Sequence, residues 1–151
     1  MKHTTKMKHL VSLLFAAGVF STNAFAADAA NYINIQPRSV TNNSASVSGD
    51  YSVAIGVNTV SEGLSALAIG SSANAKGGSS IAIGANAVST DTSSTAFGEQ
   101  AKANGYHATS LGAKSSASAI GATAVGTGAL STGGSATAVG VNANASATGA
   151  T

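Results

Sequence analysis

A glycine recurs every 14 residues along most of this 151-residue chain. The short segments that end on it are alike: SVAIG, ALAIG, SIAIG, STAFG, ATSLG, ATAVG and ATAVG. A period kept in phase this often indicates a repeat architecture, in which each unit buries its apolar surface by stacking on the next. The recurring glycines are Gly56, Gly70, Gly84, Gly98, Gly112, Gly126 and Gly140.

The positions of the repeat, numbered 1 to 14 with the recurring glycine last, accept different residues. Positions 3 and 5 are small while position 4 varies freely, and position 12 is small while position 13 is large and apolar. This alternation indicates two short strands. Position 7 is mostly glycine, with departures at Asp91 and Ala119. We therefore expect turns at positions 7 and 14, where glycine permits a positive φ.

The sequence thus predicts an all-β chain in which each repeat is strand, turn, strand, turn. Pairing each strand with its equivalent one repeat later produces a parallel β-solenoid that rises about 4.8 Å per turn, or roughly 35 Å in all. A helix is disfavoured, because a glycine every seven residues costs about 1 kcal/mol each time. Ile120 and Gly121 form a second, out-of-phase Ala-Ile-Gly, which leaves the register open there.

We expect the core of this coil to be thin, filled in each turn by the two small residues of positions 3 and 5 and one large residue of position 13. Position 13 is predicted to point inward, and the alanines of position 12 are predicted to point outward, where they would face a second chain or simply water. One coil buries little apolar area against a backbone entropy of about 1–2 kcal/mol per residue, so oligomerisation is expected. The predicted core residues are Ile55, Ile69, Ile83, Phe97, Leu111, Val125 and Val139.

The composition argues against several classes of function. Alanine accounts for 32 residues and glycine for 18, cysteine is absent, and there are only three histidines and five acidic residues. Without cysteine there is no disulfide framework and no thiolate metal site. His107 stands beside Tyr106 without further ligands in sequence. We therefore expect no enzyme, no catalytic residue, no metal site and no cofactor.

Residues 1–26 have the pattern of an export signal. A basic start is followed by an apolar stretch from Leu10 to Phe20 and a small-x-small cleavage pattern that ends at Ala26. Its removal leaves four Lys and Arg against five Asp and Glu, a net charge of −1 that does not favour nucleic acid. Residues 27–42 form a lead-in whose strand-like segment ends at Pro37. This segment is expected either to cap the coil or to be a free N-terminus.

The SxAIG strand, the 14-residue spacing and the export signal resemble the head of YadA-like trimeric autotransporter adhesins over residues 43–151. The resemblance implies a left-handed parallel β-roll, a homotrimer, and display at the outer membrane of a Gram-negative bacterium. It also implies adhesion to host matrix proteins, cells or surfaces. Complete members continue into a coiled-coil stalk and a membrane anchor, whose patterns do not occur here. We therefore expect a truncated chain, which is secreted if Thr151 is its true end.

Two other functions remain open: a structural spacer in a surface fibre, and ice binding. Ice binding is suggested by a column of threonines at position 11, but the same column is apolar in the first repeats, and threonine also favours strands. In an adhesin, we expect the ligand contacts to be distributed over position 4 and the turns. The candidate ligand residues are Asn74, Lys76, Val88, Lys102 and Leu130. The threonines are Thr95, Thr109, Thr123, Thr137 and Thr151.

Overall fold

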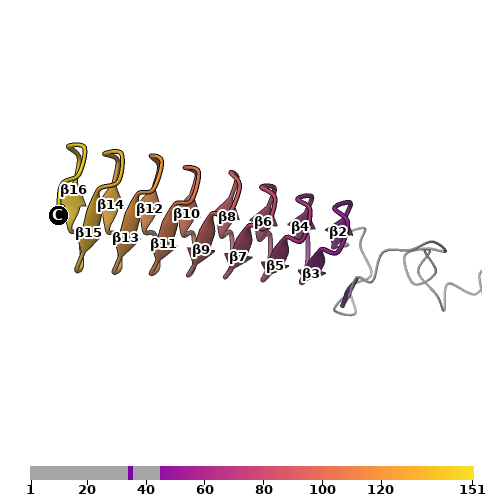
Figure 1. The fold of residues 1–151 in the computed structure, drawn as a ribbon. Coiled ribbons are helices and arrows are strands. Elements are labelled where there is room, and N and C mark those ends of the chain that lie inside the picture. The colour runs from indigo at the N-terminus through magenta and orange to yellow at the C-terminus, as the bar shows by residue number, and fades with distance from the viewer. Residues whose placement is uncertain (1–33, 36–44) are drawn as a thin grey trace, which may run out of the picture.

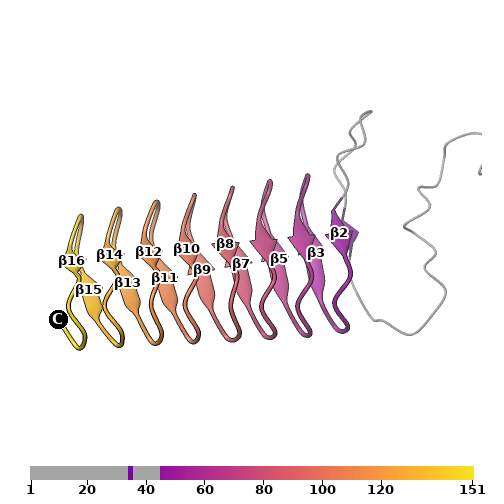
Figure 2. The ribbon, with the colours of Figure 1, turned by 90° about the horizontal axis from the view of Figure 1, so that it is seen from above.

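The computed structural model describes residues 34–35 and 45–151, so the predicted signal peptide and most of the lead-in lie outside it. Residues 45–151 form a rod of stacked coils that runs from β2 to β16 (Figure 1, Figure 2). The two-residue strands are β2 (Ser46–Val47), β4 (Val60–Ser61), β6 (Asn74–Ala75), β8 (Val88–Ser89), β10 (Lys102–Ala103), β12 (Ser116–Ala117), β14 (Leu130–Ser131) and β16 (Asn144–Ala145). The three-residue strands are β3 (Val53–Ile55), β5 (Leu67–Ile69), β7 (Ile81–Ile83), β9 (Thr95–Phe97), β11 (Thr109–Leu111), β13 (Thr123–Val125) and β15 (Thr137–Val139).

The strands form two parallel sheets. Sheet A contains the three-residue strands in the order β3-β5-β7-β9-β11-β13-β15, preceded by β1 (Asn34–Ile35). Sheet B contains the two-residue strands in the order β2 to β16. Between successive coils the paired residues are 14 apart, as in Val53 with Leu67 and Val60 with Asn74. The predicted parallel β-solenoid with 14-residue turns is confirmed.

β1 lies at the N-terminal edge of sheet A. It pairs in parallel with β3, with Asn34 opposite Ala54 and Ile35 opposite Ile55. The partners are 20 residues apart, so β1 is not another repeat of the coil. Because β3 is hydrogen-bonded on this side, the lead-in covers an edge that would otherwise be open to pairing with other chains.

The out-of-phase Ala-Ile-Gly at Ile120 does not shift the register. β13 pairs with β11 through Thr123 and Thr109, which keeps the 14-residue offset on the C-terminal side of this segment. Gly121 has a φ of 64°, and the equivalent residue of the next coil, Ser135, has a φ of 53°. The second glycine therefore occupies an ordinary left-handed turn position of its own coil.

Each coil closes with two turns of the same kind. Both have a hydrogen bond between the first and fourth residues, as from Ala73 N to Gly70 O at 3.3 Å and from Ala66 N to Gly63 O at 3.1 Å. The third residue of each turn has a positive φ, for example 57° at Ser72, and the second does not, which is the pattern of a type II turn. The recurring glycines of position 14 begin one of these turns with φ between 125° and 136°, so their predicted positive φ is confirmed.

The glycines of position 7 are needed for a different reason from the one predicted. None of them has a positive φ. A Cβ on Gly77 would collide with the backbone carbonyl of Asp91 in the next coil, and a Cβ on Gly63 would collide with that of Gly77. Backbone therefore packs directly on backbone at this corner, and the absence of a side chain matters more than the freedom of φ. These glycines are Gly49, Gly63, Gly77, Gly105 and Gly133.

The core prediction is confirmed for sheet B and wrong for sheet A. Positions 3 and 5 point inward, since Ala73 and Ala75 are fully buried. In sheet A, however, position 12 points inward and position 13 points outward: Ala82 is fully buried, whereas Phe97 is 49% exposed. The side chains wrongly assigned to the core are half-buried or exposed; they are Ile55, Ile69, Ile83, Phe97, Leu111, Val125 and Val139.

The size of the interior explains this inversion. The largest fully buried side chain among the described residues is Thr59, and the rest of the core is alanine and serine. An interior filled by side chains of this size does not accommodate a leucine or an isoleucine. Strand alternation then requires the large side chains of positions 11 and 13 to lie outside.

Buried serines make hydrogen bonds across this narrow interior. Ser89 Oγ donates to the carbonyl of Ser94 at 2.8 Å and lies 2.6 Å from Ser94 Oγ, which in turn donates to the carbonyl of Asp91 at 2.5 Å. Ser80 is at the same position as Ser94 one coil earlier, but Ser80 Oγ is buried with no hydrogen-bond partner in the described residues. The residue across the interior from Ser80 is Ala75, which stands at the position that Ser89 occupies one coil later.

Two adjacent glycines test the close approach at position 7. We expect Gly77→Ala to destabilise the protein by about 1–3 kcal/mol, because the added methyl forces the coils apart. Gly78 has no atom within 4 Å of the place where its Cβ would lie, so we expect Gly78→Ala to be neutral or slightly stabilising. Urea unfolding followed by circular dichroism, at one protein concentration, measures both. Equal losses would contradict the backbone packing described here.

The serines of position 10 allow a second matched pair. Ser94→Ala removes the hydrogen bond from Ser94 Oγ to the Asp91 carbonyl and the contact of Ser94 Oγ with Ser89 Oγ, and is expected to cost about 1–2 kcal/mol. Ser80→Ala removes a buried hydroxyl that has no partner, so the free energy of unfolding should stay the same or increase. The same urea titration distinguishes them. A larger loss at Ser80 than at Ser94 would show that the hydroxyl of Ser80 is satisfied in solution.

Candidate functional site

The outward face of sheet A has an apolar side chain at position 13 of every coil. Several of these side chains are largely exposed in the single chain: Phe97 at 49%, Leu111 at 43% and Val139 at 67%. The hydrogen-bonded register aligns them in one column along the rod. The other side chains of the column are half-buried, and a continuous apolar column that is exposed at several coils is typical of an interaction surface.

The second outward column of sheet A, at position 11, changes along the rod. It is apolar in the first coils, with Val53, Leu67 and Ile81, and becomes threonine from β9 onward. Thr95, Thr109, Thr123 and Thr137 pair in register between neighbouring strands. All of these residues are half-buried, and the threonines lie beside the apolar column of position 13.

The outward face of sheet B contains the candidate ligand residues predicted from the sequence. Asn74, Val88, Lys102 and Leu130 occupy position 4 of their coils, and Lys76 lies two residues after Asn74 on the same face. Lys102 and Leu130 are exposed, whereas Asn74 and Val88 are half-buried. The structure thus places all five on one face of the rod, spread over several coils.

Lys76 is engaged with a neighbour. Its Nζ lies 3.7 Å from Glu62 Oε2 in the preceding coil, and both side chains are 47% exposed. An exposed pair of this kind contributes less than about 1 kcal/mol to stability. Within residues 34–35 and 45–151 it is the only ion pair, so Lys102 and Lys114 have no carboxylate partner there.

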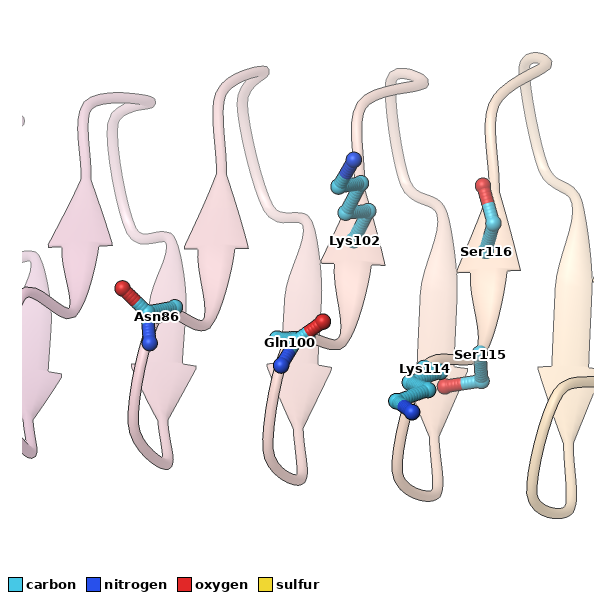
Figure 3. A pocket seen from close by; sticks show the side chains of 6 residues that line it. All are labelled: Asn86, Gln100, Lys102, Lys114, Ser115 and Ser116. Atoms are coloured by element: carbon cyan, nitrogen blue, oxygen red, sulfur yellow. The ribbon is translucent and has the colours of Figure 1, made fainter.

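These two lysines line a shallow depression in the surface of the rod, with a volume of about 650 Å³ (Figure 3). Lys102 is on β10 and Ser116 on β12, where the two residues are paired in register. Of the lining residues, only Lys102 was predicted from the sequence. Asn86, Gln100 and Lys114 lie at position 2, which varies too much along the repeat to stand out, and Ser115 and Ser116 come close to Lys102 only when the coils stack. The lining residues are Asn86, Gln100, Lys102, Lys114, Ser115 and Ser116.

Tyr106 and His107 lie at a turn on the surface, with their rings in an edge-to-face contact at 4.0 Å between centroids. Both side chains are exposed. In the part of the chain that the structure describes, no three His, Asp or Glu residues are grouped so as to hold a metal ion. The same residues contain no helix long and apolar enough to cross a membrane.

Comparison with known families agrees with this architecture. The model of the family described as "YadA head domain repeat (2 copies)" matches residues 43–60, 61–87, 89–115, 103–129 and 131–151. These matches cover nearly all of the coil and well over half of the chain. A search of curated proteins finds no match. The chain belongs to the family of YadA head domain repeats.

Proposed function

We propose that this protein is the head of a bacterial surface adhesin and attaches to host matrix proteins, cells or surfaces. The observation that carries the proposal is the rod itself: a surface repeated with a constant 14-residue register over about seven coils. Such a rod presents many similar weak contacts to a ligand that is itself fibrous or repetitive, and avidity can then exceed the affinity of one contact by roughly 10²–10⁴. Membership of the YadA head family supports the same function.

We further propose that three copies assemble through the outward face of sheet A. The interior of a single coil is alanine and serine, whose burial contributes little, while the larger apolar side chains remain outside. Burying an isoleucine, leucine or phenylalanine is worth about 1.5–3 kcal/mol, so the column of position 13 holds a large part of the available hydrophobic stabilisation. Another copy of the chain carries the same column at the same spacing along the rod, which makes it a matching partner. In this assembly the isoleucines, not the alanines of position 12, form the contact.

Display at the bacterial surface is part of the same proposal, with residues 1–26 as the export signal. A spacer without binding activity is the competing function. Ice binding by the threonine column would require sheet A to be free in solution, so trimer assembly through that face argues against it. Thermal hysteresis measured on the trimer would contradict this argument and support ice binding.

Two leucines of similar exposure test the assembly. Leu111 is 43% exposed on sheet A, and Leu130 is 37% exposed on sheet B. We expect Leu111→Glu to abolish the trimer, because three carboxylates would be buried together at a cost of several kcal/mol each. Leu130→Glu should leave the trimer intact. Light scattering coupled to gel filtration measures the mass of each. A wild-type monomer, or equal behaviour of the two variants, would contradict the proposed interface.

Deletion of one repeat tests the distributed binding surface. Removing residues 57–70 takes out one full 14-residue unit and leaves the register of the remaining coils unchanged. We expect the affinity of the trimer for immobilised fibrous matrix protein to fall gradually with each unit removed, by a similar factor each time. Surface plasmon resonance measures this.

The control for this deletion is the mass of the trimer, which should fall only by the residues removed. Complete loss of binding after one deletion, with the trimer intact, would indicate a discrete site in that coil. Absence of binding by the wild-type trimer to matrix protein, cells and surfaces would leave the spacer as the function.

A further inference from the structure

We propose that the depression around Lys102 and Lys114 is a binding site for an anionic polysaccharide, one that carries sulfate or carboxylate groups along a linear chain. This inference deepens the proposed adhesin function, on which it rests only for exposure at the cell surface. It is carried by the charge, the alignment and the hydrogen-bonding groups of the lining residues. All six appear in Figure 3.

The lining of the depression carries a net positive charge. Its lining contains two lysines and no acidic residue. Of the lysines in the described part of the chain, Lys76 is paired with Glu62, which leaves Lys102 and Lys114 without an ion-pair partner. The nearest acidic residue in sequence, Glu99, accepts a hydrogen bond from Gln100 Nε2 at 3.1 Å and forms no ion pair with either lysine. Lys102 and Lys114 thus contribute two ammonium groups without an ion-pair partner to the lining of one depression, from neighbouring coils.

The turn residues of the depression follow the rod axis. Asn86, Gln100 and Lys114 occupy position 2 of three successive coils and lie side by side in Figure 3. Neighbouring coils are about 4.8 Å apart, so the three positions span about 10 Å, close to the length of one disaccharide unit. Their backbones are held by hydrogen bonds to the preceding coil, each of 2.8 Å, and share a φ of 57° or 58°. The row is therefore pre-ordered before a ligand binds.

The other lining groups suit sugar hydroxyls. The amides of Asn86 and Gln100 can donate and accept hydrogen bonds, and Ser116 adds a hydroxyl beside Lys102. Ser115 is not expected to contribute, because its Oγ is buried and bound to Ser110 Oγ at 2.7 Å and to the Gly112 carbonyl at 2.8 Å. No aromatic ring lines the depression, so bases have no surface on which to stack. This favours a polysaccharide over a single-stranded nucleic acid.

The fold does not require lysine at these places. Position 2 is Asn58, Ser72 and Asn142 in other coils, and position 4 ranges from valine to asparagine. Both lysines nevertheless fall in neighbouring coils and open into one depression. In the proposed trimer the site would be present three times.

The test measures binding of the full exported chain to immobilised heparin, a sulfated polysaccharide, by surface plasmon resonance. We expect binding that weakens as salt concentration rises. Lys102→Gln and Lys114→Gln should each weaken it by about tenfold, the factor for one charge-assisted hydrogen bond. The control is Lys76→Gln, which removes the same charge from the paired lysine outside the depression. It should change the affinity little.

Four results would overturn the inference. They are equal losses in all three lysine variants, unchanged binding in the Lys102→Gln and Lys114→Gln variants, equally tight binding of an uncharged dextran, and no heparin binding by the wild type. Tighter binding of single-stranded DNA at the same lysines would assign the site to nucleic acid instead.

A wild-type trimer that binds matrix protein but not heparin refutes only the polysaccharide site and leaves the adhesin function standing. Lysine-dependent heparin binding by a chain that is monomeric and binds no matrix protein refutes the proposed assembly and adhesin function instead.

Discussion

The rod depends on the direct stacking of backbone on backbone from one coil to the next. Every coil is joined to its neighbours by parallel strand pairing and by hydrogen bonds between equivalent turns, such as Ser72 N to Val57 O at 2.8 Å. The coils approach closely at position 7, which explains why glycine predominates there, with Asp91, Ala119 and Ala147 as the departures. The strict 14-residue period therefore reflects a geometric requirement of the backbone more than a requirement of any side chain.

A thin interior follows from the same geometry and determines the character of the surface. A core of alanine, serine and glycine leaves the larger apolar side chains of sheet A outside, where a single chain cannot bury them. In most small domains the hydrophobic stabilisation lies within one chain, whereas in the proposed trimer much of it would become available only when the chains associate. Folding and assembly would then be closely coupled, and the stability of the head would depend on protein concentration.

The sequence was sufficient to predict the strands, the turns and the 14-residue register, because these depend on glycine and on alternation, which are visible in single residues. It was not sufficient to predict which side of sheet A faces inward. Alternation shows that positions 12 and 13 point in opposite directions, but only the distance between the sheets decides which is inside. Because large apolar residues are usually buried, Ile83 was predicted to point inward and Ala82 outward. In this narrow coil Ala82 is the buried residue. The partners of Lys102 were missed for a related reason, since residues 12 and 16 positions apart in sequence meet only when the coils stack.

The division between constrained and free positions shows where function can arise in such a repeat. Positions 3, 5, 7, 10, 12 and 14 are occupied mostly by small residues, as the interior and the corners require, while positions 2, 4 and 6 face outward and vary in size and charge. Two substitutions at free positions in adjacent coils place their side chains only one or two coil rises apart, about 5–10 Å. A repeat protein of this kind can therefore acquire a discrete site, such as the one proposed at Lys102 and Lys114, without any change in its backbone. The distributed surface and the local site are compatible. The repeated positions produce the distributed surface, and substitutions at the variable positions produce the local site.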